Sequence, residues 1–275
     1  MKTKAYAKIN LGLKVVSKYD DGYHELEMIM TKINLFDTLI FKESDDVSVI
    51  CPEVNESDNL VYKIAKYLHD KYNVNKGVKI EIKKMIPLQA GLGGGSSDGA
   101  TTFITLNKLW KLGLDRDCLI NESKQFGSDI AFFIDGGPSF VQGKGEILED
   151  IKIKNKLYLL LIKPEFGCST KEIYDNIDTY SAKGELKDLI FSLEKGNINE
   201  VSNSLVNDLE KGLPKEKQID INNIKRDLIA YGAAGSLMSG SGSCVFGVFN
   251  SKFERNKAYK GLRMFYDIVK VETKD

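Results

Sequence analysis

The sequence predicts an α+β fold, because segments with strand periodicity alternate with segments with helical periodicity along its 275 residues. Apolar side chains recur at every second residue from Ala5 to Val15, which is typical of a strand with one buried face. Over residues 58–72 they recur at i, i+4 and i+8 instead, which is typical of an amphipathic helix. At about 150 residues per domain the length predicts two domains or one large one; we expect two, at residues 1–150 and 151–275.

The other elements follow from the same two periodicities. Asp21-Gly22 is a turn signal before a second β-rich run, Met28–Phe41, and the first helix can be capped by Ser57 or Asp58. Alternation returns over residues 78–83, which predicts a further strand. The second half is expected to contain a strand at 157–162, helices around 185–209 and 218–231, a strand, a helix near 252–264 and a final strand.

The composition is that of a globular protein without an electrostatic preference for nucleic acids or membranes. With 42% hydrophobic residues and only 5 prolines, the chain has the material for a core, which excludes disordered and collagen-like proteins. Its 39 basic and 39 acidic side chains give neither the basic patch of nucleic-acid binders nor a polybasic membrane anchor. We therefore expect a cytoplasmic protein with no nucleic-acid or membrane partner. A small-molecule substrate is implied only by the family resemblance given below, and a monomer or weak homodimer is expected.

Neither a targeting segment nor a metal site is predicted. No stretch reaches the ~18 apolar residues of a membrane-spanning helix, and Lys4 and Lys8 interrupt the place where a signal peptide would have its apolar region. The 4 cysteines form no C-x-x-C pair, and only 2 histidines accompany them. This spacing gives no recognisable zinc cage and favours reduced, mostly buried thiols.

The strongest functional signal is a glycine-rich loop between the strand at 78–83 and a helical pattern that follows at once. Glycines let the backbone approach a phosphate closely, and the free amides and dipole of the next helix favour an anion. Ser96 and Ser97 can cap that helix or donate their hydroxyl groups to phosphate oxygens. A flexible linker is the alternative, but ordered patterns adjoin the loop on both sides. The predicted phosphate site comprises Pro87, Leu88, Gln89, Ala90, Gly91, Leu92, Gly93, Gly94, Gly95, Ser96 and Ser97.

The residue pattern excludes three familiar classes of nucleotide-binding protein. A Walker A loop needs a lysine after its second glycine, and none follows these glycines. A dinucleotide fingerprint needs a third glycine at the position of Ser96. The H-R-D and D-F-G motifs of protein kinases do not occur.

The loop resembles the ATP loop of the GHMP kinases, P-x-x-x-G-L-G-S/G-S-S. Further blocks resemble that family's motifs in its order: Ala7-Lys8-Ile9-Asn10-Leu11, Asp21-Gly22-Tyr23-His24, Gly127-Ser128-Asp129-Ile130 and Ser239-Gly240-Ser241-Gly242-Ser243-Cys244. Two positions depart from the pattern, since Ala131 stands where Pro is usual and Gly99 where Ala is common. The five blocks run from residue 5 to about 248, so the resemblance covers nearly the whole chain.

This resemblance implies the two-domain GHMP kinase fold, with a ribosomal-S5-like N-terminal domain that carries the ATP loop and catalytic residues, and a ferredoxin-like C-terminal domain. It implies ATP with Mg²⁺, the metal being held mainly by phosphate oxygens. The branch of the family that it matches best phosphorylates the 2-hydroxyl of 4-diphosphocytidyl-2-C-methyl-D-erythritol in non-mevalonate isoprenoid synthesis.

The resemblance also implies catalytic roles. Asp129 would be the base that takes the proton of the acceptor hydroxyl, and Lys8 would keep that carboxylate ionised and stabilise the developing alkoxide. Asn10, on the same strand face as Lys8, could orient the substrate. From the residues alone, Asp129 could instead complement a helix dipole, and the Lys8 face could be a solvated sheet surface.

At the acceptor end, the resemblance implies that Tyr23 and Tyr174 sandwich a cytosine while His24 reads its edge. Thr170 stands four residues before Tyr174, which is the family's spacing. Taken alone, Tyr23 and His24 could mark an ordinary hairpin tip, and Tyr174 could be a helix aromatic that faces the core. The glycine loop at 239–243 could likewise be a plain hairpin turn.

Two other functions remain open. A GHMP kinase acting on homoserine or mevalonate would have no base to stack on Tyr23 and His24. A nucleotide-binding sensor without catalysis would need the loop but neither Lys8 nor Asp129.

Overall fold

The computed structural model describes residues 1–274, which divide by their contacts into two compact units. The first unit comprises Met1–Ala7, Leu35–Ile86 and Gly93–Gly136, and the second comprises Lys8–Asn34, Pro87–Leu92 and the residues from Gly137 onward. The units interleave along the chain because the long strands β1 (Lys2–Lys18) and β2 (His24–Ser44) contribute residues to both. The domain boundary at residue 150 stays a prediction.

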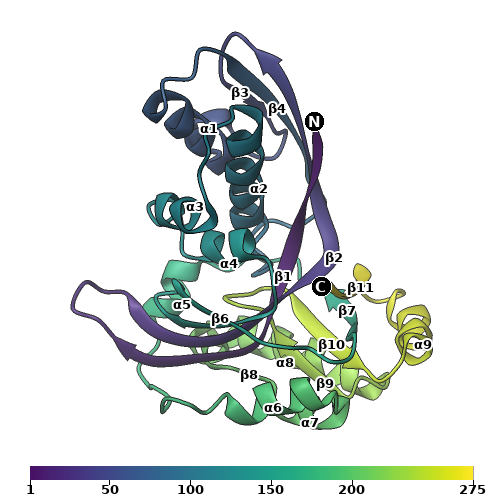
Figure 1. The fold of residues 1–275 in the computed structure, drawn as a ribbon. Coiled ribbons are helices and arrows are strands. Elements are labelled where there is room, and N and C mark those ends of the chain that lie inside the picture. The colour runs from purple at the N-terminus through teal and green to yellow at the C-terminus, as the bar shows by residue number, and fades with distance from the viewer. Residues whose placement is uncertain (275) are drawn as a thin grey trace. The chain divides into compact units, whose positions relative to one another are not determined.

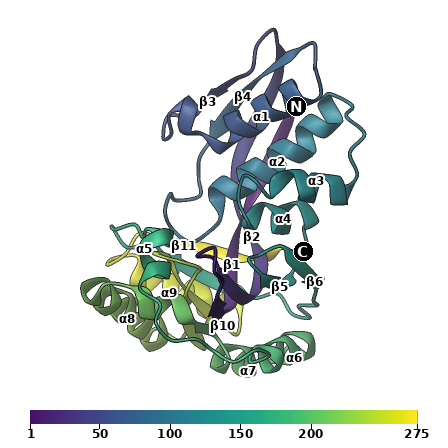
Figure 2. The same cartoon turned by 90° about the vertical axis from the view of Figure 1, so that its left-hand side faces the viewer.

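The first unit is a small sheet with helices packed beside it (Figure 1). The distal half of β2 pairs antiparallel with β4 (Gly77–Lys83), and β3 (Ser48–Ile50) runs parallel to β4. Helix α2 is central among the helices, since it contacts α1, α3 and α4, and Figure 2 shows these helices together. The helices are η1 (Glu56–Asp58), α1 (Leu60–Lys71), α2 (Gly94–Leu109), α3 (Arg116–Ser123) and α4 (Asp129–Asp135).

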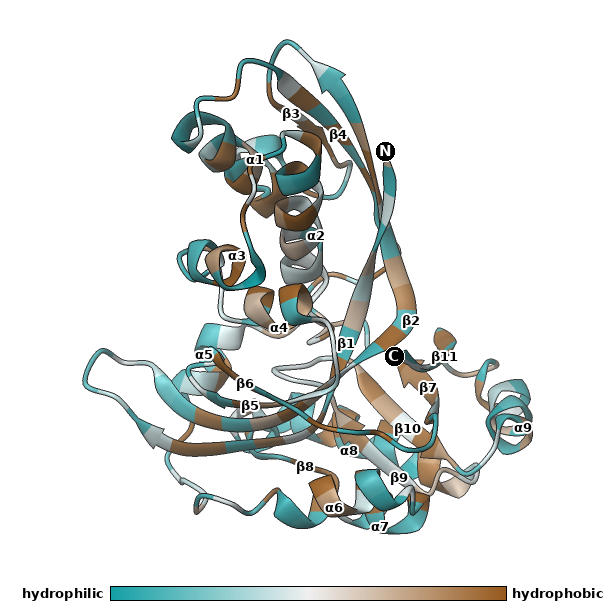
Figure 3. Cartoon of the chain, in the orientation of Figure 1, coloured by the Kyte–Doolittle hydropathy of each residue, from teal (hydrophilic) through white to brown (hydrophobic). Residues whose placement is uncertain are grey.

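Apolar side chains from both layers form the core of this unit. Phe41 and Ile80 come from the sheet, and Ile64, Phe103 and Phe132 come from the helices, and all five are fully buried. Each follows from the periodicity of its own segment, and Figure 3 shows hydrophobic residues, in brown, recurring along these helices and strands.

The second unit contains an antiparallel sheet in the order β11-β7-β10-β9. Helices α8 and α9 pack against these strands, which gives a β-α-β-β-α-β arrangement of the ferredoxin-like type that the resemblance implies. The central strand β10 is buried at every residue and accordingly reads as an unbroken apolar run. The elements are β7 (Tyr158–Ile162), α8 (Lys215–Ala230), β9 (Gly235–Met238), β10 (Val245–Phe249), α9 (Lys252–Leu262) and β11 (Ile268–Lys274).

The remaining elements of this unit lie around residues 8–34, the part of β1 and β2 that belongs to it. The proximal half of β2 pairs with β5 on one stretch and with β11 on another, and β1 pairs in parallel with β8. The elements are β5 (Ser139–Gly143), β6 (Ile147–Asp150), α5 (Thr170–Asp175), α6 (Lys187–Lys195), α7 (Ile198–Asn203), β8 (Val206–Asn207) and η2 (Asp208–Gly212).

Two sequence predictions about helices are wrong. The helix expected over 185–209 is two short helices, because Gly196 adopts a left-handed conformation that ends α6 and Asn197 caps α7. The cap of α1 is Asn59, whose side chain accepts a hydrogen bond from the Val61 amide, since residues 56–58 form a 3₁₀ turn of their own. The helices expected over 218–231 and 252–264 are confirmed as α8 and α9.

All four cysteines are free thiols, as expected, but only Cys168 and Cys244 are buried, while Cys118 is exposed. Among residues 1–274, no helix has both the length and the apolar run that crossing a membrane requires.

Candidate active site

The glycine-rich loop ends on Gly93, which takes a left-handed conformation (φ 67°) and serves as the N-cap of α2. The first backbone hydrogen bond of the helix runs from the Ser97 amide to the Gly93 carbonyl at 2.9 Å. The amides of Gly94, Gly95 and Ser96 therefore precede the helix's own bonding pattern and lie at the positive end of its dipole. Ser96 and Ser97 do not cap the helix, because both lie inside its first turn.

Two glycines of the loop have opposite surroundings. Gly91 has a φ of +70°, and a Cβ there would overlap the carbonyl oxygen of Ser239, so only glycine fits. A Cβ at Gly95 would meet no atom within 4 Å. The chain is thus fixed by backbone packing at Gly91 and has open space beside Gly95 in the first turn of α2.

The segment 239–243 packs onto this loop. The Ser239 hydroxyl donates to the Gly91 carbonyl at 3.0 Å, and the Cys244 amide donates to the Ala90 carbonyl at 3.1 Å. The segment also connects the antiparallel strands β9 and β10. Its topology is therefore that of a hairpin turn, which was the alternative expected from the sequence. Its glycines let this tip lie directly against residues 89–91.

Lys8 and Asn10 project from the same side of β1, and both are buried. Lys8 Nζ donates to Asn10 Oδ1 at 2.5 Å, and a Cβ on Gly240 would lie 3.0 Å from that Nζ. The Lys8 amide also donates to the Leu92 carbonyl at 3.0 Å. A solvated sheet face is therefore wrong, because the segments 87–92 and 239–243 cover these side chains.

Asp129 is the first residue of α4 and is half-buried, followed by the buried Ile130 and Phe132. It belongs to the first unit and Lys8 belongs to the second, so the expected pairing of the two stays a prediction. The departure at Gly99 has a local reason, since a Cβ there would lie 2.9 Å from Ile64 Cδ1 where α1 packs on α2.

Among the residues expected to bind the acceptor, the structure brings His24 and Tyr174 together. Their rings stack with centroids 5.1 Å apart and an interplanar angle of 28°. The His24 side chain is buried, and its Nε2 atom has no hydrogen-bond partner. Burial lowers the pKa of His24, which keeps its imidazole neutral at pH 7. The pair therefore offers a buried, neutral polar atom beside an aromatic face.

Tyr23 lies at the hairpin tip, and 62% of it is exposed. Lys144 Nζ lies 5.0 Å from the centroid of the Tyr23 ring and forms an ion pair with Asp21. Sequence reasoning missed Lys144, because nothing in the spacing between the turn and the β5–β6 connection shows that they meet.

Thr170 is the first residue of α5, which also carries Tyr174. Its Oγ1 shares a hydrogen bond of 2.8 Å with the Ser241 hydroxyl, so α5 is tied to the segment 239–243.

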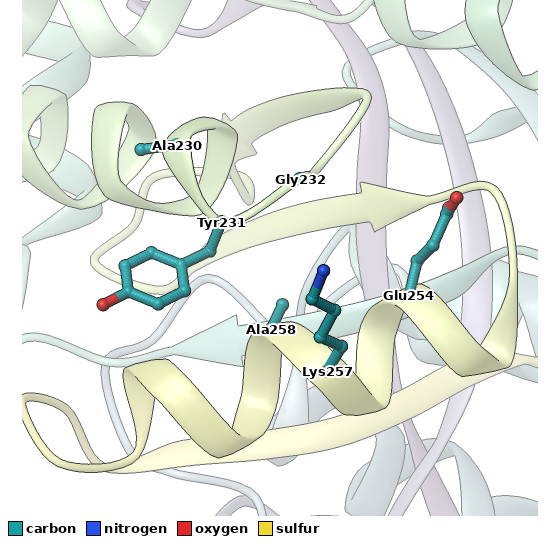
Figure 4. A pocket seen from close by; sticks show the side chains of 6 residues that line it. All are labelled: Ala230, Tyr231, Gly232, Glu254, Lys257 and Ala258. Carbon is teal, nitrogen blue, oxygen red and sulfur yellow. The ribbon is translucent and has the colours of Figure 1, made fainter.

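A pocket of about 470 Å³ lies where the C-terminal end of α8 meets α9 (Figure 4). None of the site residues expected from the sequence lines it. Its lining residues are Ala230, Tyr231, Gly232, Glu254, Lys257 and Ala258.

Comparison with known proteins places these features in a family. The chain matches the GHMP kinases N terminal domain over residues 59–137 and the GHMP kinases C terminal domain over residues 189–268. It is 41% identical to a 4-diphosphocytidyl-2-C-methyl-D-erythritol kinase of Thermoanaerobacter pseudethanolicus, over 98% of this chain and 94% of that one. The same kinase of Thermodesulfovibrio yellowstonii is 44% identical over 94% of this chain and 92% of that one.

A crystal structure of 4-(cytidine 5'-diphospho)-2C-methyl-D-erythritol kinase is similar over 100% of both chains, with a TM-score of 0.87 and 28% identity. The resemblance seen in five sequence blocks and the two-domain fold that it implies are thereby confirmed. The chain belongs to the GHMP kinase family.

Proposed function

We propose that this protein transfers the γ-phosphoryl group of ATP to the 2-hydroxyl of 4-diphosphocytidyl-2-C-methyl-D-erythritol. The observation that carries the choice of acceptor is the His24–Tyr174 pair, which presents a buried Nε2 without a partner beside an aromatic face. Such a pair suits a planar base with hydrogen-bonding groups on its edge. Relatives at about 40% identity bear the name of this activity.

In the proposed reaction, the acceptor oxygen forms a bond to the γ-phosphorus as the bond to the ADP oxygen breaks. The Asp129 carboxylate accepts the proton of the acceptor hydroxyl, and the Lys8 ammonium stabilises the negative charge that develops on the oxygen. Asn10, which accepts a hydrogen bond from Lys8, fixes the direction in which that ammonium points.

ATP is proposed to bind with its phosphates at the amides of Gly94, Gly95 and Ser96. Three amides at the end of a 16-residue helix suit an anion of this kind. Mg²⁺ would accompany ATP, held mainly by phosphate oxygens, and would neutralise charge on the transferred group. Within residues 1–274, no three side chains of the His, Cys, Asp or Glu types are grouped so as to hold a metal ion.

At the acceptor end, the cytosine is proposed to stack on Tyr23 and Tyr174, with its edge hydrogen-bonded to His24. Tyr23 is largely exposed, so its ring is accessible to a base on the side that Lys144 does not cover. Stacking on an aromatic contributes about 1–3 kcal/mol per base, so the two tyrosines would supply much of the acceptor affinity.

The test is a substrate panel with Mg·ATP and the purified protein, followed by ³¹P NMR of the products. We expect a new phosphate monoester on the cytidine-linked polyol and none on homoserine or mevalonate. Phosphorylation of homoserine or mevalonate alone would replace this proposal with another GHMP kinase activity. ATP binding without turnover of any acceptor would indicate a sensor.

A further inference from the structure

Three charged side chains of the first unit are buried together where β4 leads into the glycine-rich loop. Lys84 Nζ forms ion pairs with Asp37 and, at 2.8 Å, with Asp98. The side chain of Lys84 is 7% exposed, and those of Asp37 and Asp98 are 0% and 5% exposed. Buried charges are tolerated when they are paired, so we treat these three residues as one unit, the Lys84 cluster.

The cluster connects the chain that enters the loop with the helix that leaves it. Asp37 Oδ1 accepts hydrogen bonds from the amides of Met85 (2.5 Å) and Ile86 (2.8 Å), the last residues before the loop. Asp98 lies on α2, about one turn beyond its first residue. Through Lys84, the two carboxylates therefore fix the two ends of the loop relative to each other.

The ammonium group of the cluster also lies against the first residue of α2. A Cβ on Gly94 would be 3.4 Å from Lys84 Nζ and 3.0 Å from Ile86 Cγ2. The backbone of Gly94 therefore rests on the cluster, and its amide is one of the three that precede the helix's own bonding pattern.

The charges of the cluster do not balance, because two carboxylates face one ammonium and leave an excess of negative charge when both are ionised. Burial raises the pKa of Asp98 to about 7; Lys84 opposes this rise, and Asp37 adds to it. Asp98 Oδ1 has no hydrogen-bond partner. The side chains of α1 and α4 next to this turn, around Gly99, are apolar: Leu60, Ile64 and Ile130. A proton on Asp98 would remove the negative charge that pairs with Lys84, and this would loosen the link between the two ends of the loop.

We propose that Lys84, Asp37 and Asp98 are positioning residues, which hold the amides of Gly94, Gly95 and Ser96 in the geometry that binds the ATP phosphates. This inference rests on the proposed binding of ATP at the loop. The cluster acts through the backbone of the loop and does not touch the phosphates. Nucleotide binding is therefore coupled to the ion pair between Lys84 and Asp98.

The test is a comparison of two affinities, measured by calorimetric titration of Mg·ATP and of the cytidine-linked acceptor into each variant. Asp98→Asn keeps the side-chain volume and removes the charge that Lys84 pairs with. We expect it to weaken ATP binding at least about fivefold, the low end of couplings between neighbouring sites, and to change acceptor affinity less than about twofold. Lys84→Met should behave alike, and the double variant should show less than the product of the single effects if the residues act together.

A pH series supplies a readout that simple loss of stability would not move. Between pH 6 and 8 the wild-type ATP affinity should rise as Asp98 loses its proton and its carboxylate pairs with Lys84, beyond the change that the nucleotide's own titration causes. Asp98→Asn should retain only the nucleotide's part. Asp220→Asn, the same chemical change on an exposed residue of α8, should follow the wild type. Val61→Ala, a truncation in the buried face of α1, should lower the melting temperature without a selective loss of ATP affinity.

The outcomes separate this inference from the proposed function. If the wild type binds ATP but Asp98→Asn binds it equally well with the same pH dependence, the positioning role is wrong and the kinase function stands. Equal losses of ATP and acceptor affinity would also overturn the positioning role, because they would indicate general damage. If the wild type binds no ATP, the proposed function fails and this inference fails with it.

Discussion

The proposed phosphate loop and the proposed acceptor end differ in which part of the chain is available for binding. At the loop the groups are backbone amides at the start of α2, positioned by glycine conformations at Gly91 and Gly93. At the acceptor end they are side chains, His24 after the hairpin turn and Tyr174 on α5, which are 150 positions apart. A site made of backbone needs a contiguous sequence of defined residues. A site made of side chains can change its ligand by substitution without refolding the chain.

The two regions also differ in how they tolerate change. Gly91 is in contact with the backbone of Ser239, so a side chain there has no space. Tyr23 is exposed and is in contact with the flexible side chain of Lys144. We therefore expect mutations in the loop to act on folding and ATP together, and mutations at the acceptor end to act on the acceptor alone.

The largest expected effect separates chemistry from binding in both regions. Asp129→Asn should lower turnover at least about 10²-fold, because the proton of the acceptor hydroxyl loses its proposed base. Calorimetric affinities for ATP and acceptor should stay near wild type. Asp117→Asn, on an aspartate whose side chain is 87% exposed, is the matched control and should keep full turnover. Near-normal turnover of Asp129→Asn would remove it from the catalytic role.

A glycine pair tests whether the loop is held by its backbone. Gly91→Ala should lower the free energy of unfolding by about 1–3 kcal/mol from its positive φ alone, with a further loss from the clash with Ser239. Gly95→Ala should change it by less than about 1 kcal/mol, because the position is open and helical. Denaturant unfolding of both variants measures the difference. Equal stability of the two would contradict the backbone account of this loop.

The acceptor end is tested by removing one ring. Tyr174→Ala should weaken binding of the cytidine-linked acceptor by about 1–3 kcal/mol, which is about 5- to 150-fold, and leave ATP binding unchanged. Tyr174→Phe keeps the stacking face and should behave like the wild type. Titration calorimetry with each ligand distinguishes them. A loss of ATP affinity with an unchanged acceptor affinity would reverse the assignment of the two regions.

The smallest effect concerns the protonation of His24. Its pKa is lowered in the folded protein, mainly by burial, so the folded state binds fewer protons than the unfolded state near and below pH 6.5. The contribution of His24 to stability is complete above that pH and is lost as the pH falls through the folded pKa. Thermal unfolding from pH 7.5 to 5 should show a steeper decline for wild type than for His24→Gln. Parallel curves would mean that the imidazole is not desolvated.

Much of the fold could be predicted because its signals are local. The alternation in β1 and β2, the helical stripes of α1, α8 and α9, and the Asp21-Gly22 turn each report the conformation of their own segment. The glycine-rich loop could be predicted for the same reason. Left-handed backbone conformations favour glycine, so a loop with such conformations just before a helix is visible as a run of glycines. The split at Gly196 was missed although the residue was visible, because a glycine weakens a helix without always ending it.

The sequence by itself determined the α+β class, the conformation of the glycine-rich loop at the start of a helix, and the family. The tertiary structure decided that the polar face of β1 is buried, that His24 stacks on Tyr174, and that Lys144 reaches Tyr23. It also decided that Lys84 pairs with two carboxylates from other segments. The physical reason is that a residue's own neighbours set its backbone conformation, whereas its burial and its charge partners depend on which distant segment folds over it. A strand pattern shows which side chains share a face, but only the packed chain shows what covers that face.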